Sequence, residues 1–249
     1  MVHFSQLAVS ALLCAGYATA ALLVDYNATR SDDVAKMGLA NLEAARDKPQ
    51  HGNTADLYIK ADNDWKGAKS AHFHRKQGDI RAEYHALRGN TQEGKTYFIG
   101  YQFALGSTPD NMMVFQWKEY IANTQGKGQA SIPLRLIVKN KTLQLNYDPM
   151  LSEGRQTLWS APIKPKTVYT VALEILAKDA GQGHVRMWLD GKPVTFDTTK
   201  STLLQGNMFP GRSEPKFGIY NGEAVVTDNW VYQVQIGEAK KDLDSKFIS

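Results

Sequence analysis

Polar and apolar residues alternate one by one along much of the chain from Asp56 onward. In Asp79–Leu87, the polar residues Arg81, Glu83 and His85 share one side of an extended chain, opposite small and aromatic residues. A period of two residues is typical of a strand with one face against the core and the other face toward solvent. This pattern therefore predicts β-strands that carry long polar side chains on their outer face.

Several segments show this alternation or a continuous apolar run, and turn-forming pairs such as Asp190-Gly191 and Asn221-Gly222 separate some of them. No helical pattern lies between them, which favours an antiparallel β-sandwich or barrel. The expected strands are Asp56–Ala61, His72–Leu87, Lys95–Leu105, Met112–Tyr120, Leu134–Val138, Thr142–Tyr147, Thr157–Ile163, Val168–Lys178, His184–Leu189, Lys216–Tyr220 and Val225–Ile236.

One stretch near the N-terminus has helical spacing instead. Ser31 or Asp32 could cap a helix, and Pro49 would stop it. The apolar positions between them recur at roughly helical intervals: Val34, Met37, Leu39, Leu42 and Ala45. We therefore expect a short N-terminal helix within Ser31–Asp47. The polar C-terminal stretch Glu238–Ser249 is expected to be loose.

The first twenty residues have the features of a secretory signal peptide. Leu7–Gly16 is a short apolar run, and Ala18-Thr19-Ala20 has the small-x-small pattern of a cleavage site. A buried N-terminal strand or helix is the alternative reading. Cleavage would leave one domain, residues 21–249, without Cys14, the only cysteine. The expected location is extracellular, with Asn27 and Asn140 in triplets that can accept glycans.

The net charge of +4 suits a polyanionic partner, although it also fits an ordinary protein surface. Nucleic acid is a poor candidate, because the chain has an export signal and lacks a basic run or a nucleic-acid motif. The N-terminal apolar run is too short to span a bilayer, so no membrane partner is expected. We expect a monomer that binds an acidic polysaccharide.

Three of the predicted strands resemble the signature strands of jelly-roll polysaccharide lyases. These segments are Arg81-Ala82-Glu83, Phe115-Gln116-Trp117-Lys118 and Lys216-Phe217-Gly218-Ile219-Tyr220. Over its whole length the chain is most similar to polysaccharide lyase family 20, the fungal endo-β-1,4-glucuronan lyases. The resemblance implies an all-β, concanavalin-like jelly roll of two antiparallel sheets with a cleft. It also implies β-elimination on a uronic acid polymer, and a structural calcium ion away from the cleft.

The resemblance suggests roles for the polar residues on these strands. Arg81 and Gln116 would stabilise the substrate carboxylate as charge develops on it, and Tyr220 would transfer protons. Related lyases have a histidine base where this chain has Lys118. Tyr220 would then act as both base and acid, or a histidine elsewhere would be the base. Candidate bases are His85, on the same predicted face as Arg81, and His74. Predicted substrate contacts are Lys216, Lys118, Arg135 and Glu83.

Each of these residues could instead be an ordinary solvated side chain, because a polar outer face is also what a plain exposed sheet has. No histidine–cysteine cluster has zinc-finger spacing. For the implied calcium ion, Asp228 is the candidate ligand, since calcium requires only carboxylate and carbonyl oxygens.

Two other functions remain open at this stage. A sugar-binding lectin on the same fold would need exposed tryptophans, but Trp117 alternates away from Gln116 and is expected in the core. A retaining glycoside hydrolase would need two close carboxylates. Glu83 has no obvious partner at the required spacing. A lyase acting on alginate or another uronan is a further alternative to one acting on glucuronan.

Overall fold

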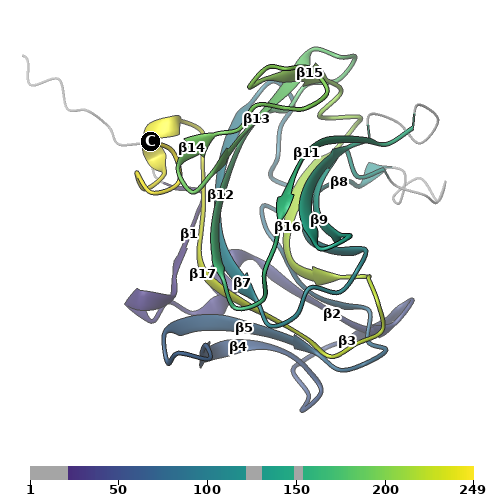
Figure 1. The fold of residues 1–249 in the computed structure, drawn as a ribbon, viewed down its shortest axis with the longest axis vertical. Coiled ribbons are helices and arrows are strands. Elements are labelled where there is room, and N and C mark those ends of the chain that lie inside the picture. The colour runs from purple at the N-terminus through teal and green to yellow at the C-terminus, as the bar shows by residue number, and fades with distance from the viewer. Residues whose placement is uncertain (1–21, 122–130, 149–153) are drawn as a thin grey trace, which may run out of the picture.

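The computed structural model describes residues 22–121, 131–148 and 154–249, which form two packed antiparallel sheets (Figure 1). The first sheet has nine strands. Their order is β14 (Lys192–Pro193), β13 (Gly183–Leu189), β12 (Val168–Leu176), β7 (Thr96–Leu105), β17 (Thr227–Gly237), β5 (Lys69–Arg75) and β4 (Leu57–Asn63), with β1 (Val24–Asn27) on β17 and β15 (Leu204–Gly206) on β13.

The second sheet has eight strands, and Figure 1 shows β8, β9 and β16 strongly curved. Their order is β11 (Gln156–Pro162), β10 (Thr142–Tyr147), β9 (Leu134–Lys139), β8 (Met112–Glu119), β16 (Ser213–Tyr220), β6 (Arg81–His85), β2 (Leu39–Ala45) and β3 (Lys48–Gln50). The two-sheet jelly-roll architecture predicted from the sequence is confirmed. In the described part of the chain, no helix is both long and apolar enough to cross a membrane.

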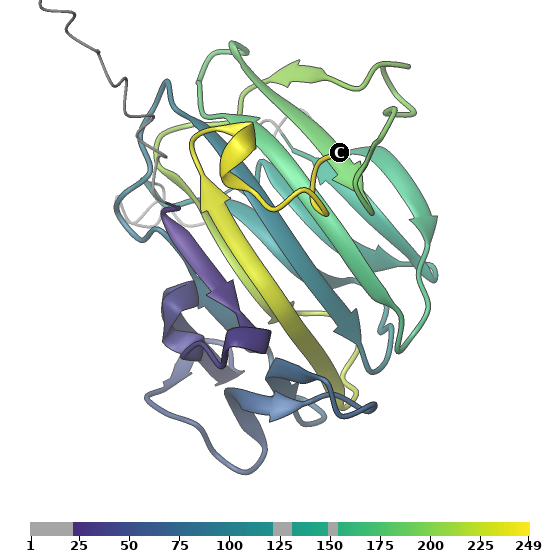
Figure 2. The ribbon, with the colours of Figure 1, turned by 90° about the vertical axis from the view of Figure 1, so that its left-hand side faces the viewer.

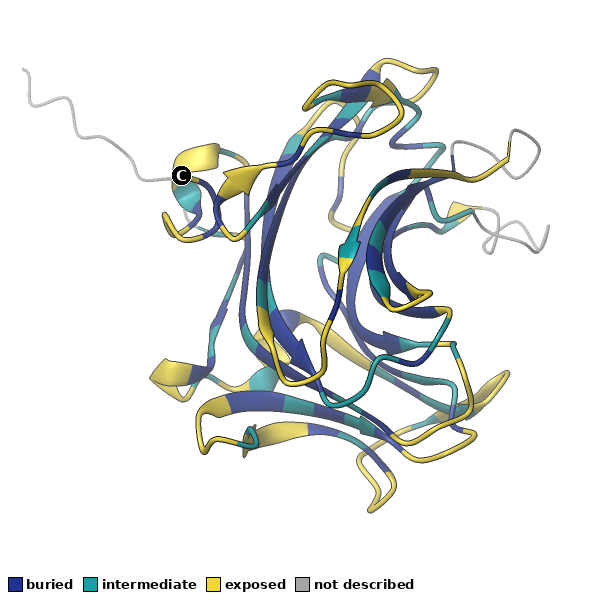
Figure 3. Cartoon of the chain, in the orientation of Figure 1, coloured by how far each residue is buried: buried dark blue, intermediate teal, exposed yellow. Residues whose placement is uncertain are grey.

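The apolar halves of the alternating strands meet between the sheets. Figure 3 shows buried residues along the strands and exposed residues in the turns. Phe115, Phe217 and Ile219 are almost completely buried there. Trp117 is 0% exposed, and its indole Nε1 donates to the Met208 carbonyl at 2.6 Å. Trp117 is therefore a core residue, as the sequence predicts, and is not available to stack on a sugar.

The predicted helix within Ser31–Asp47 is wrong. That stretch begins with the short 3₁₀ turn η2 (Val34–Met37) and continues as β2. Gly38 separates the two with φ = 127°, a conformation that an α-helix does not allow. Leu39 is 51% exposed, so its place in the apparent helical stripe does not reflect burial. Pairing with β6 provides the backbone hydrogen bonds of β2 in place of a helix.

The predicted strand His72–Leu87 is two strands that belong to different sheets. β5 pairs with β4 and β17, whereas β6 pairs with β2 and β16. The chain crosses between the sheets at residues 76–80, where Gly78 has φ = 90°. Both halves alternate in the same way, so the periodicity gives no sign of the crossing.

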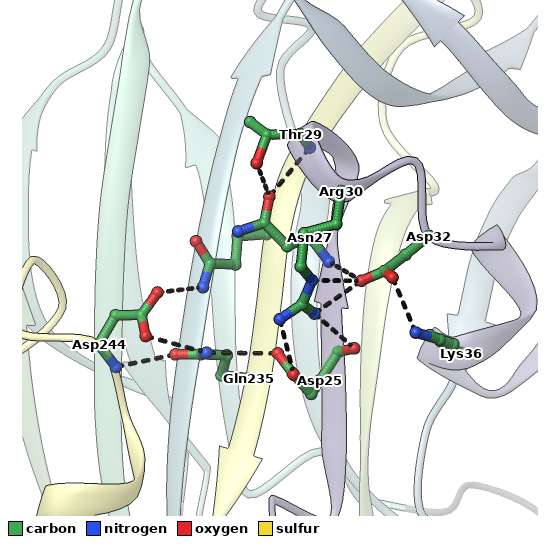
Figure 4. A network of polar contacts seen from close by, with 9 residues as sticks. Asp25, Asn27, Thr29, Arg30, Asp32, Lys36, Gln235 and Asp244 are labelled. Atoms are coloured by element: carbon green, nitrogen blue, oxygen red, sulfur yellow. Dashed lines mark hydrogen bonds and ion pairs between the residues drawn. The ribbon is translucent and has the colours of Figure 1, made fainter.

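The two ends of the described chain meet on the first sheet. Figure 4 shows Gln235 of β17 between Asp25 of β1 and Asp244 of the C-terminal segment. The same view shows Asn27, whose Oδ1 accepts from the Thr29 N–H and hydroxyl at 2.9 and 2.7 Å and so caps the 3₁₀ turn η1 (Ala28–Arg30). Asn140 lies in an exposed turn. Glycosylation of these two asparagines remains a prediction.

The C-terminal segment is packed rather than loose, contrary to the sequence-based expectation. After β17 it forms the 3₁₀ turn η3 (Lys240–Asp242) and then lies across the outer face of the sheet (Figure 2). Phe247 is 0% exposed within a second hydrophobic cluster that includes Phe98 and Trp188. Gly100 lies beneath it, and a Cβ added there would lie 2.8 Å from the Phe247 ring.

Replacing Phe247 with alanine should lower the free energy of unfolding by about 3 kcal/mol or more, because the ring leaves a cavity. Urea denaturation would measure the change. Ser245→Ala, at an exposed position of the same segment, is the matched control and should change stability by less than about 0.5 kcal/mol. Equal stabilities of the two variants would mean that the segment contributes little to the fold.

Candidate active site

The outer face of the second sheet carries the polar residues in rows across neighbouring strands. Backbone pairing places Lys216 of β16 opposite His85 of β6 on one side and Gln116 of β8 on the other. Arg81 of β6 lies opposite Tyr220 in the same way. The three signature strands are therefore adjacent, and their predicted site residues converge on one surface.

This surface is hollowed into a cleft of about 610 Å³. Six of its lining side chains are arginine or lysine and two are carboxylates, so the cleft is electropositive. The cationic residues are Arg46, Arg81, Arg88, Lys118, Arg212 and Lys216, and the acidic ones are Glu43 and Asp47. His85, Gln116 and Tyr220 also line the cleft.

Glu83 lies beneath the lining residues and is 0% exposed. Its Oε1 accepts from Gln116 Nε2 at 2.5 Å, and its Oε2 lies 3.5 Å from both Lys216 Nζ and Arg81 Nε. A carboxylate buried in this way is stabilised by its cationic neighbours, and it holds them in place in return. Glu83 thus supports the cleft from below and does not line it.

Asn41 of β2 joins the two cations from the other side. With its amide oriented to satisfy its neighbours, its Oδ1 accepts from Arg81 Nη1 and Lys216 Nζ, both at 2.8 Å. Lys216 is only 2% exposed, and burial lowers its pKa although Glu83 opposes this effect. Arg81 and Lys216 are therefore fixed between Asn41 and Glu83.

Tyr220 lies at the end of β16, next to Arg81. The Arg81 guanidinium carbon is 4.2 Å from the centroid of the Tyr220 ring, and interaction with Tyr220 raises the pKa of Arg46. Two residues earlier, Gly218 has φ = 136°, and a Cβ there would meet the Ala82 carbonyl of β6. The β16–β8 register shifts between Phe217 and Tyr220. This explains why the signature strand needs a central glycine before its tyrosine.

His85 is held firmly at the opposite side of the cleft. Its Nε2 bonds the buried Glu214 carboxylate, and its ring stacks on Tyr120 with centroids 4.7 Å apart. Burial would raise the pKa of Glu214, but the hydrogen bonds from His85 and the Gly89 N–H outweigh this and lower it. Glu214 therefore stays ionised, and one nitrogen of His85 is already engaged.

Lys118 lies at the position where the family resemblance led us to expect a histidine. Its Nζ lies 4.6 Å from the centroid of the Tyr120 ring and donates to the Glu119 carbonyl at 3.0 Å. Burial, together with the neighbouring cations Lys216 and Arg81, lowers the pKa of Lys118 to about 8. Burial is the largest cause, and the cationic neighbours add to it, in keeping with the surplus of positive charge along the cleft.

Besides Glu83, three predicted residues lie outside the cleft lining: Arg135, Asp228 and His74. Arg135 of β9 is opposite Gln116 but is 3% exposed, and its Nη2 pairs with Asp148 Oδ2 at 3.3 Å. Asp228 lies on the other sheet, near the start of β17, where it contacts His72 and His74. His74, a candidate base in the sequence, is therefore on the other sheet and does not line the cleft.

The structure adds residues that sequence reasoning missed. Asn41, Glu43 and Arg46 come from β2 and the turn after it, the stretch interpreted as a helix. Glu43 Oε2 lies 3.3 Å from Arg81 Nε. Tyr120 and Arg212 also line the cleft. The alternation of Asn41 and Glu43 around Leu42 could have predicted this strand and its polar face.

Solved structures with the same fold include several polysaccharide-degrading enzymes. One similar structure is the endo-β-1,4-glucuronan lyase of the fungus Trichoderma reesei, with a TM-score of 0.57 and 18% sequence identity. The match covers 85% of this chain and 99% of that chain. An alginate lyase from Pseudomonas aeruginosa has TM-score 0.51, 12% identity, and coverage of 80% and 98%.

A conserved carbohydrate esterase from the Shiga toxin-encoding bacteriophage phi24B is also similar, with TM-score 0.54, 15% identity, and coverage of 87% and 98%. A search of curated proteins gave no match. At these identities the solved structures establish the fold alone. The family is established separately, because the family model named "Polysaccharide lyase" matches residues 29–236, which is most of the chain. The chain therefore belongs to the polysaccharide lyase family.

Proposed function

We propose that this polysaccharide lyase cleaves a β-1,4-linked uronan by β-elimination, with glucuronan as the favoured substrate. The observation that carries the proposal is the electropositive cleft, in which Arg81 lies against the Tyr220 ring and shares Asn41 with Lys216. The similarity to a fungal glucuronan lyase supports the choice of polymer. Residues 1–20, which lie outside the described residues, support secretion, and we propose that the enzyme acts outside the cell as a monomer.

The difficult step is removal of the C5 proton next to a charged carboxylate. As the C5–H bond breaks, negative charge spreads onto the carboxylate oxygens, so the site needs cations and donors aimed at them. Arg81 and Lys216 supply two fixed positive charges, and Asn41 holds both. Because the Gln116 amide donates to Glu83 in the substrate-free site, we assign Gln116 to positioning through Glu83.

Tyr220 is the residue we propose for proton transfer. In a glucuronate ring the C5 hydrogen and O4 lie on the same face, so one group can serve both positions. Tyr220 as phenolate takes the C5 proton, the C4–C5 double bond forms, the C4–O4 bond breaks, and the same hydroxyl returns the proton to O4. Arg81 and Arg46 place positive charge beside the hydroxyl that transfers the proton.

The lowered pKa of Lys118 leads to a testable pH dependence. Below pH 8 the amine is charged and attracts the uronan; above pH 8 it becomes neutral. Affinity for glucuronan should therefore fall by about tenfold between pH 7 and 9, the effect of losing one charge-assisted contact. Lys118→Arg keeps its charge at pH 9 and should lose this dependence. Calorimetric titration in the Tyr220→Phe background would measure binding without turnover. If affinity falls with pH equally with and without the Lys118→Arg change, the charge of Lys118 is not what attracts the uronan.

The function itself is tested with glucuronan, alginate and heparin as substrates. Elimination leaves a double bond conjugated with the carboxylate, so a rise in ultraviolet absorbance identifies a lyase. We expect this rise to be largest with glucuronan. New reducing ends without the absorbance would indicate a hydrolase, and binding without either signal would indicate a lectin.

A further inference from the structure

A second cluster of functional side chains lies on the outer face of the other sheet. His72 and His74 lie two residues apart on β5 and therefore share one face of the strand. Asp228 of β17 is paired with His74. One carboxylate oxygen, Oδ1 of Asp228, is 2.8 Å from His72 Nε2 and 2.7 Å from His74 Nδ1. One ligand atom from each of the three residues lies within 4.8 Å of the others. The cluster belongs to neither the cleft nor the core.

Aromatic neighbours orient both imidazoles. Trp230 stacks on His72 with ring centroids 5.3 Å apart, and Tyr58 stacks on His74 at 4.9 Å. The edge of Tyr58 also faces His72 at 5.2 Å. His72 is held between Trp230 and Tyr58, and His74 rests on Tyr58, so the donor atoms are largely pre-oriented before a ligand arrives. The side chains of His72, His74 and Asp228 keep 12%, 19% and 27% of their surface exposed, which leaves a path for an ion.

A second carboxylate lies behind His72. Its remaining ring nitrogen, Nδ1, is 3.4 Å from Asp62 Oδ2 and 3.5 Å from the Tyr58 hydroxyl. A carboxylate behind a coordinating histidine fixes its tautomer and increases its basicity, an arrangement that commonly supports metal-bound histidines. This places Asp62 in a supporting position, although the Asp62 pair is longer than an ideal hydrogen bond.

We propose that His72, His74 and Asp228 bind a divalent transition-metal ion of the zinc class. Two imidazole nitrogens and one carboxylate match the ligands of zinc and differ from the all-oxygen set of calcium. The calcium ion implied by the family resemblance therefore does not fit Asp228 as the structure places it. Donor atoms around a tetrahedral zinc ion are roughly 3.3 Å apart, so the contacts at 2.7 and 2.8 Å must open by only about half an ångström.

The expected consequence is a clamp between β5 and β17. β5 leads directly into the crossing that delivers β6 and its Arg81 to the cleft. Binding to the folded state alone stabilises it, so a hundred-fold excess of zinc over its dissociation constant should raise Tm by roughly 5–10 °C.

The experiment uses the chain purified without a polyhistidine tag, stripped with EDTA and titrated by calorimetry with Zn²⁺ and, separately, with Ca²⁺. We expect one equivalent of Zn²⁺ to bind at least about a hundred-fold more tightly than Ca²⁺. His72→Ala and His74→Ala should each abolish this selectivity, and Asp62→Asn should weaken zinc binding about 10–100-fold. Co²⁺ in place of Zn²⁺ should give visible absorption bands, a readout independent of lyase activity.

His184→Ala is the matched control. His184 also lies on the first sheet and bonds a carboxylate, Glu174, at 2.8 Å, but without a second histidine in that cluster. This variant should bind zinc like the wild type. The proposal is overturned if no zinc binds, if zinc binding survives the double change His72→Ala and His74→Ala, or if Ca²⁺ binds more tightly than Zn²⁺ through Asp228.

Discussion

Tyr220→Phe should lower kcat for uronan cleavage by about 10³-fold or more while leaving substrate affinity nearly unchanged. The substitution removes the hydroxyl that takes and returns the proton, and general acid–base groups typically contribute about 10²–10⁴-fold. The ring would remain under the Arg81 guanidinium, so the cleft keeps its shape. Initial rates from ultraviolet absorbance give kcat, and calorimetry of the variant gives affinity.

Two further variants separate this role from its competitors. Tyr232→Phe removes a hydroxyl that bonds Asp64, away from the cleft lining, and should leave the rate unchanged. His85→Asn tests the histidine as base: with Tyr220 as both base and acid, this variant should keep measurable turnover. A rate loss in His85→Asn equal to that in Tyr220→Phe would assign the base to His85. Near-normal turnover in Tyr220→Phe would overturn its role altogether.

The strands of the cleft could be predicted from the sequence, because each has one face in the core and therefore an alternating pattern of apolar and polar residues. Trp117 and Phe115 alternate with Gln116 and Lys118, and burial of the apolar pair fixes which way the polar pair points. A shift of one residue would bury the polar set, so the pattern determines the register. The same reasoning predicted that Arg81, Glu83 and His85 share a face.

Other parts of the structure could not be predicted from the sequence, because they do not depend on alternation with a buried face. β2 has only one well-buried apolar residue, Leu42, so its alternation is weak and its spacing resembles a helix. The cluster of His72, His74 and Asp228 depends on a ladder between segments about 150 residues apart in the chain, which periodicity cannot reveal. The depth of Glu83 depends on Lys216 and Gln116 covering it, a property of side-chain packing across three strands.

The fold by itself leaves the chemistry open. A lyase from Trichoderma reesei and a bacteriophage carbohydrate esterase share it at similar TM-scores. The assignment to elimination therefore depends on what the cleft can do. Fixed cations beside a tyrosine suit removal of a proton next to a carboxylate, and the buried Glu83 is the group that keeps two of those cations in position.

Glu83→Gln should lower the free energy of unfolding by about 3 kcal/mol and also reduce activity. The amide keeps the shape of Glu83 but removes the negative charge that balances Lys216, which is 2% exposed. Breaking a buried ion pair from one side typically costs about 3–5 kcal/mol, because the other charge is left uncompensated. Urea denaturation would measure the loss of stability, and absorbance assays the loss of rate.

The double variant Glu83→Gln with Lys216→Met separates the two effects. Without the lysine no uncompensated ammonium remains, so most of the lost stability should return, as it does when both members of a buried pair are replaced. Activity should not return, because the cation that faces the uronate carboxylate is also gone. If both stability and activity recover, Lys216 only balances Glu83 and Arg81 alone stabilises the developing charge. If neither recovers, the main function of Glu83 is to hold Gln116, whose Nε2 donates to Glu83 Oε1 at 2.5 Å.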